Sequence, residues 1–225
     1  MRKEDDPGPA ARLAAAGDDA ARAFERRAEP TLALAGQAEA IAAACHAMAV
    51  RFHEGGKLVV FGTGSASTDA QHVAVEFVHP VIVGKRALPA ISLTTDVATV
   101  TGVAAREGMD AIFSYQLRYL AAPEDIALGI SVDGNCASVL AGLVKAKELG
   151  LLTIALVGGV VGSGPAERGD GGAIAASPAV DHTLLASSDD PRLVKEMHVT
   201  IYHVLWELVH VFFEQPGVLA PEVLA

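Results

Sequence analysis

The sequence LVVFGTGSASTDAQHVAVEF, residues 58–77, changes character twice along its length. It begins as an apolar run typical of a buried strand, and it passes through a turn that contains Gly62 and Gly64. It then continues as a segment with helical spacing of its apolar residues. A strand that leads through a glycine turn into a helix is typical of a parallel α/β sheet. This stretch therefore predicts the fold class.

The rest of the chain repeats the alternation. Strand-like apolar runs lie at 57–61, 88–93, 126–131, 151–157 and 180–185. Helices are predicted at 68–79, 97–106, 109–121, 135–149 and 191–214. Strands that alternate with helices indicate a parallel sheet covered on both faces. The glycine-rich segment 158–179 is predicted to be a loop with room for one short helical turn.

The two ends of the chain differ from this α/β pattern. Residues 1–17 are charged and contain two prolines, so we expect a flexible tail. The alanine-rich segment 18–53 predicts two helices, at about 18–28 and 31–53, that could make oligomer contacts. The α/β domain is expected at 54–215, followed by a C-terminal tail at 216–225.

Composition excludes several classes of function. The formal net charge of -10 opposes nonspecific binding to nucleic acid and leaves no polybasic patch for a membrane. No uncharged apolar run reaches the length of a membrane span, and the N-terminus lacks the apolar core of a signal peptide. We therefore expect a cytoplasmic protein whose Cys45 and Cys136 are free thiols. An anionic ligand would need local hydrogen-bond donors.

The glycine turn has more than one interpretation. Its hydroxyl residues precede a helix N-terminus, where free N–H groups favour an anion such as phosphate. A dinucleotide site would need a third glycine at the usual spacing and an acidic residue about 20 positions later, and both are missing. A tight strand–helix connection with small residues for packing fits the turn equally well.

His72 and Glu76 lie four residues apart, so they share one face of the predicted helix. An ionised Glu76 could take a proton from carbon or hold a metal ion. A solvent-exposed pair on a helix has the same spacing, so the two residues alone do not identify a site.

Five motifs together carry a resemblance to a known family. GTGSAST, DAQHVAVE, LPAISLTTD, LGISVDGN and RLVKEMHVTIYHVLWELV occur in this order between about residues 30 and 214. In order and spacing they resemble the sugar isomerase (SIS) domain family, and within it the phosphoheptose isomerases. The resemblance implies a flavodoxin-like five-stranded parallel sheet in a homotetramer, with active sites between subunits.

The resemblance also implies roles for particular residues. Glu76 and His203 would be the acid/base pair that moves a proton between C1 and C2 of an open-chain sugar phosphate, such as sedoheptulose 7-phosphate. In some members the positions that match His72, Glu76 and His203 bind zinc together with a glutamine. Lys195 takes the position of that glutamine here. The expected substrate-binding residues come from two phosphate loops, one strand end and the last helix: Gly64, Ser65, Ser67, Thr68, Asp96, Ser131, Asp133, Asn135 and Lys195.

This sequence departs from the family pattern in its second phosphate loop. Hydroxyl residues of the family are replaced in the sequence SVDGNC, residues 131–136, and Asp133 introduces a carboxylate. A like-charge pair at ~5 Å costs about 3 kcal/mol at an effective dielectric of ~20, so Asp133 would oppose a phosphate. Alternatively, Asp133 turns away and caps the next helix.

Lys195 and the first phosphate turn depart from the pattern too. Ala66 stands where the family has a serine, and an ammonium such as that of Lys195 is a poor zinc ligand. Lys195 could instead pair with Glu76. These departures keep a second hypothesis open, in which the protein is a non-catalytic SIS protein that binds a sugar derivative or a partner protein as a regulatory scaffold.

Overall fold

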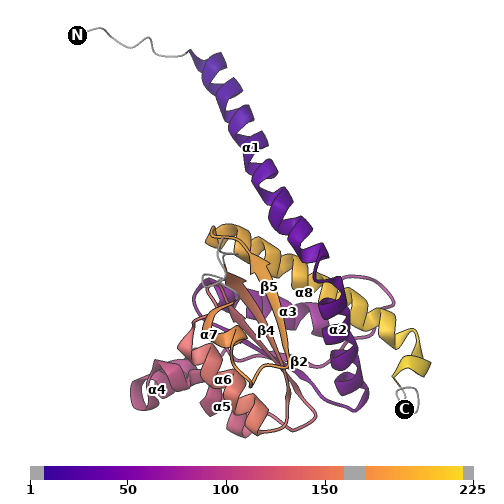
Figure 1. The fold of residues 1–225 in the computed structure, drawn as a ribbon. Helices are drawn as coiled ribbons and strands as arrows, with labels where there is room; N and C mark the ends of the chain where they lie inside the picture. The colour runs from indigo at the N-terminus through magenta and orange to yellow at the C-terminus, as the bar shows by residue number, and fades with distance from the viewer. Residues whose placement is uncertain (1–7, 160–170, 220–225) are drawn as a thin grey trace.

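The central sheet has five parallel strands in the order β2-β1-β3-β4-β5 (Figure 1). The computed structural model describes residues 8–159 and 171–219. The strands are β1 (Leu58–Gly62), β2 (Ala90–Ser92), β3 (Ile126–Ser131), β4 (Leu152–Gly159) and β5 (His182–Ser187). The predicted flavodoxin-like parallel sheet is confirmed.

Helices cover both faces of the sheet. Beside the N-terminal α1 and α2, they are α3 (Ser65–Val78), α4 (Val97–Glu107), α5 (Ile112–Leu120), α6 (Ala137–Glu148), α7 (Gly172–Ala175) and α8 (Pro191–Phe213), with 3-10 turns at Met109–Ala111 and Pro216–Val218. Helices α2, α3 and α8 pack on one face, and α4 to α7 pack on the other. The predicted short turn within 158–179 is α7, while residues 160–170 lie outside the described residues.

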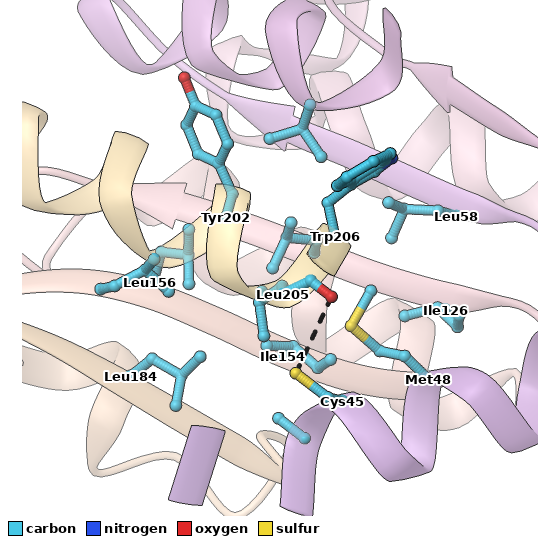
Figure 2. Packing of buried hydrophobic residues seen from close by; sticks show 14 of the residues in the cluster. Cys45, Met48, Leu58, Ile126, Ile154, Leu156, Leu184, Tyr202, Leu205 and Trp206 are labelled. Carbon is cyan, nitrogen blue, oxygen red and sulfur yellow. Dashed lines mark hydrogen bonds between the residues drawn. The ribbon is translucent and has the colours of Figure 1, made fainter. Parts of the chain in front are cut away.

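The two cores follow from the alternation of side chains along each strand. In β1, Leu58 and Val60 face the layer of α2, α3 and α8, whereas Val59 and Phe61 face the opposite layer. Figure 2 shows the first of these cores, where Leu205 of α8 lies over the sheet beside Cys45. Burial on both faces explains why β1, β3 and β4 are continuous apolar runs rather than alternating ones.

The N-terminal region differs from the prediction. Helix α1 runs from Pro9 to Ala35 and α2 from Ala38 to His53, so residues 9–17 are helical rather than a tail. Proline is favoured at the start of a helix, and the alanine-rich sequence has high helix propensity. The break falls after Ala35, and the helix continues through Pro30.

Among the described residues no single helix has both the length and the hydropathy of a membrane span, although the bent pair 12–35 and 38–53 reaches them jointly.

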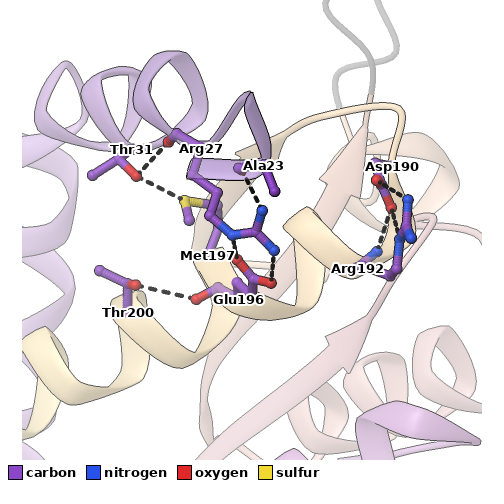
Figure 3. A network of polar contacts seen from close by, with 8 residues as sticks. All are labelled: Ala23, Arg27, Thr31, Asp190, Arg192, Glu196, Met197 and Thr200. Atoms are coloured by element: carbon purple, nitrogen blue, oxygen red, sulfur yellow. Dashed lines mark hydrogen bonds and ion pairs between the residues drawn. The ribbon is translucent and has the colours of Figure 1, made fainter. Parts of the chain in front are cut away.

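One ion pair fixes the C-terminal half of α1 to the body (Figure 3). The Arg27 guanidinium donates two hydrogen bonds to the Glu196 carboxylate of α8, each 2.7 Å long. The part of α1 that precedes Arg27 extends away from the sheet (Figure 1), and its apolar Leu13 and Phe24 are each 76% exposed. A helix that exposes large apolar side chains is suited to contact another protein surface.

At the other end of the chain, the predicted tail begins with ordered contacts. His46 Nε2 lies 3.1 Å from the Val218 carbonyl oxygen, and Leu219 is buried in the core. The tail prediction is therefore wrong for residues 216–219, and residues 220–225 lie outside the described residues.

Candidate active site

Helices α3 and α8 bring three predicted site residues into one cluster. The nearest ligating atoms of His72, Glu76 and His203 all lie within 4.8 Å of one another. His72 Nε2 is 3.1 Å from Glu76 Oε1, and the His72 and His203 ring centroids are 5.3 Å apart. Two helices that are far apart in the sequence thus supply one carboxylate and two imidazoles to the same place.

The apolar stripes of the two helices produce this arrangement. Val73 and Phe77 of α3 are buried on the same sheet face as Met197 and Ile201 of α8. Once these stripes are packed, the positions next to them on each helix face one another. The spacing of four between His72 and Glu76 puts both side chains on the α3 face that meets His203.

The cluster lines a cavity of about 540 Å³. Its other lining residues are Val81, Ile82, Lys85, Trp206, Glu207 and Val211. The Glu76 side chain is 14% exposed and that of His72 is 42% exposed, so the carboxylate lies deeper in the cavity. A partly desolvated carboxylate beside imidazoles can remove a proton from carbon and supply one to oxygen.

Tyr202 is a member of the cluster that the sequence interpretation missed. Its hydroxyl oxygen lies 2.7 Å from His72 Nδ1, and its ring contacts both imidazoles edge-on. Burial raises the pKa of the Tyr202 hydroxyl, and the charges of Asp69 and Glu76 raise it further. The hydroxyl therefore stays protonated and able to donate. The only signal in the sequence is its position directly before His203.

Lys195 does not pair with Glu76, which corrects the expectation from the sequence. Its Nζ lies 2.6 Å from Asp69 Oδ1, 2.9 Å from the Ser65 carbonyl oxygen and 3.1 Å from Thr68 Oγ1. Lys195 precedes His203 by eight residues, or about 12 Å along a helix, so it reaches the first turn of α3 instead. The buried Asp69, another residue that the sequence interpretation missed, attracts the ammonium there.

The glycine turn places the predicted phosphate residues in the first turn of α3. Helix α3 begins at Ser65, directly after Gly64, whose φ of 59° favours glycine. Ser67 Oγ donates to the Gly64 carbonyl and Thr68 Oγ1 donates to the Ser65 carbonyl. Gly64 and Ser67 line a separate cavity of about 190 Å³.

In the second predicted phosphate loop, polar groups of the loop form hydrogen bonds with one another. Asp133 Oδ1 accepts hydrogen bonds from Ser131 Oγ at 3.0 Å and from the Asn135 backbone N–H at 2.9 Å. The Asn135 side chain accepts from Ala173 N. Because α6 begins at Ala137, Asp133 does not cap that helix as suggested; it occupies two donors of the loop.

Asp96 is used as a helix cap. It precedes α4, and its carboxylate accepts from the Thr99 backbone N–H at 3.1 Å and from Thr99 Oγ1 at 2.5 Å. These hydrogen bonds lower the pKa of the Asp96 carboxyl. Among the described residues, neither Asp96 nor the residues of the two predicted phosphate loops line the Glu76 cavity.

Comparisons with known proteins agree with the fold and with these motifs. The sequence profile of the SIS domain matches residues 24–158. A phosphoheptose isomerase of Solidesulfovibrio magneticus is 39% identical over 185 residues, which cover 82% of this chain and 84% of that protein.

Solved structures give the same result. A phosphoheptose isomerase from Francisella tularensis has a TM-score of 0.76 and 31% identity, covering 87% of this chain and 98% of that chain. The phosphoheptose isomerase of Neisseria gonorrhoeae has a TM-score of 0.74 and 28% identity, covering 86% and 97%.

Proposed function

The chain belongs to the SIS domain family, and from this premise we propose that it is an aldose–ketose isomerase acting on a sugar phosphate. The observation that carries the proposal is the cavity that holds the Glu76 carboxylate and the His203 imidazole within 4.8 Å of each other. Because the similar proteins are named phosphoheptose isomerases, sedoheptulose 7-phosphate is the first substrate to test.

The reaction needs one base near carbon and one acid near oxygen. Starting from the ketose, Glu76 takes a proton from C1 while His203 gives a proton to the C2 carbonyl oxygen, which forms an enediol. His203 then removes the proton from the C1 hydroxyl, and Glu76 returns its proton to C2. The C1 aldehyde forms, and both side chains end in their starting states.

The three side chains also fit a zinc ion. Imidazole nitrogen and carboxylate oxygen are ordinary zinc ligands, and a catalytic site keeps a position open beyond three protein ligands. His72, Glu76 and His203 would hold the metal, and Lys195 would not, since its ammonium is bound to Asp69. Bound zinc would supply a positive charge near the oxygens of the enediol.

Zinc binding is measured by equilibrium dialysis followed by metal analysis. We expect wild-type protein to retain zinc and His203→Gln to retain much less, because a ligand is lost. His53→Gln, which changes an exposed histidine on α2, is the matched control. Equal zinc content in wild type and His203→Gln would contradict a site at this cluster.

The substrate site of a single chain is divided. The Glu76 cavity and the cavity at the glycine turn have separate linings. Helix α1 exposes Leu13, Phe24 and Leu32. We infer that further copies of this chain pack against α1 and complete the site, in the homotetramer that the resemblance implies.

Light scattering on a size-exclusion column is expected to give four times the mass of one chain, and a monomer would contradict the assembly.

Removal of the base tests the catalytic assignment. Glu76→Gln keeps the size of the side chain but cannot take a proton, so exchange of the C1 and C2 protons of the substrate in heavy water should be lost. Nuclear magnetic resonance of the sugar follows the exchange directly. Glu148→Gln, on the exposed end of α6, should exchange at the wild-type rate. Exchange by Glu76→Gln at the wild-type rate would refute the assignment.

The charge of Asp133 tests whether the second loop binds the phosphate. Asp133→Ser removes a carboxylate and frees Ser131 Oγ and the Asn135 N–H. If a phosphate binds at this loop, KM for the sugar phosphate should fall by about tenfold, equivalent to about 1.4 kcal/mol, with little change in kcat. An unchanged KM would show that the phosphate does not bind at this loop.

A further inference from the structure

We propose that Tyr202 is a positioning residue for the isomerase reaction, because its buried hydroxyl orients His72 and, through His72, Glu76. The inference rests on the proposed function and adds a residue outside the expected acid/base pair. Three groups form the path: the hydroxyl lies 2.7 Å from His72 Nδ1, and His72 Nε2 lies 3.1 Å from Glu76 Oε1.

The chemistry of the three groups sets the direction of both hydrogen bonds. An ionised carboxylate only accepts, so Glu76 requires the proton of His72 to be on Nε2. A neutral imidazole with its proton on Nε2 has a lone pair on Nδ1, and this lone pair needs a donor. The Tyr202 hydroxyl is that donor. Tyr202 therefore donates a hydrogen bond to His72, and His72 donates one to Glu76.

These two hydrogen bonds make the two oxygens of the Glu76 carboxylate different. Oε1 accepts from His72, whereas Oε2 has no hydrogen-bond partner in the part of the chain that the structure describes. The carboxylate is thus held by one oxygen and can offer the other to carbon. A base fixed in this way is oriented before the substrate arrives, which lowers the cost of reaching the transition state.

Packing of the Tyr202 ring in the core sets the position of its hydroxyl. The residue is 1% exposed, and its ring belongs to the core cluster that joins α8 to the sheet. Figure 2 shows the hydroxyl pointing away from Leu205 and Cys45. His72 is held less by packing, since 42% of its side chain is exposed. The buried residue can therefore orient the more exposed one.

The same hydroxyl is compatible with a metal on the cluster. If Nε2 of His72 binds zinc, the proton moves to Nδ1, and the hydroxyl oxygen can accept it because a phenol both donates and accepts. Groups that hold the second nitrogen of a ligating histidine typically change activity or metal affinity by about 10- to 100-fold. The positioning role thus holds in either state.

Tyr202→Phe is the test variant, because it keeps the ring in the core and removes only the hydroxyl. We expect kcat for the sugar phosphate to fall by about 10- to 100-fold, while KM changes by less than about threefold. In a His72→Gln background the same substitution should have little further effect, since the pathway is already broken. Tyr119→Phe, at an exposed tyrosine of α5, is the matched control and should match wild type.

A second measurement does not depend on activity. Histidine is labelled with ¹⁵N, metal is removed with a chelator, and spectra are recorded at about pH 8, above the ordinary histidine pKa. The His72 signals are assigned by their loss in His72→Gln. In wild type we expect the proton on Nε2, and in Tyr202→Phe we expect the Nδ1 resonance to move as its lone pair loses a donor.

The outcomes separate this inference from the proposed function. A wild-type protein that turns over no sugar phosphate removes the isomerase, and the histidine spectra still decide the Tyr202 contact. A wild-type His72 with its proton on Nδ1, or spectra unchanged in Tyr202→Phe, overturns the inference. So does a Tyr202→Phe enzyme with wild-type kcat, or an equal loss in the presence and absence of His72.

Discussion

The packing of α8 against α3 on one face of the sheet is the constraint on which the site depends. The apolar stripes of both helices are buried in one core with β1, β3 and β4. That packing fixes the rotation of each helix, and the rotation decides which polar side chains meet. Ile201, Tyr202 and Leu205 of α8 are each 1% exposed, so they fix which face of α8 is buried. This rotation of the helix turns His203 toward Glu76 and His72. A substitution that rotated α8 would separate His203 from Glu76 without changing either residue.

The contact between the helices also contains polar groups that are costly to leave unpaired. Asp69 is 4% exposed, and Lys195 supplies the charge that it needs. Breaking a buried pair by removing one partner typically costs about 3–5 kcal/mol, and the partial exposure of Lys195 reduces that figure here. His198 is fully buried in the same helix, and burial lowers its pKa to about 4, so it is neutral near neutral pH. One end of the interface is thus ionic, and the other carries the Tyr202, His72 and Glu76 chain.

The sequence was sufficient for the sheet and for the cluster of His72, Glu76 and His203, for different reasons. The central strands β1, β3 and β4 are buried on both faces, which leaves continuous apolar runs that are easy to recognise, and the glycine turn marks where α3 begins. The cluster was found through the resemblance of the motifs around His72, Glu76 and His203. The helical state of residues 9–17 was missed because two prolines and many charges outweighed the high helix propensity of alanine. The partner of Lys195 and the contact of Tyr202 depend on how two helices cross, and no pattern within one helix contains that information. Capping of the next helix was one of two alternatives for Asp133, and it is wrong because Asp133 binds Ser131 and Asn135 before α6 begins.

The central claim is that one sugar binds with its reacting carbons between Glu76 and His203. A crystal structure with a hydroxamate analogue of the enediol tests it most directly, because the planar hydroxamate resembles the intermediate more than the sugar. The hydroxamate oxygens should lie within hydrogen-bonding distance of His203, with the Glu76 carboxylate over the position of C1 and C2. A hydroxamate bound away from this cavity, or one that contacts only one of the two side chains in the complete assembly, would contradict the account.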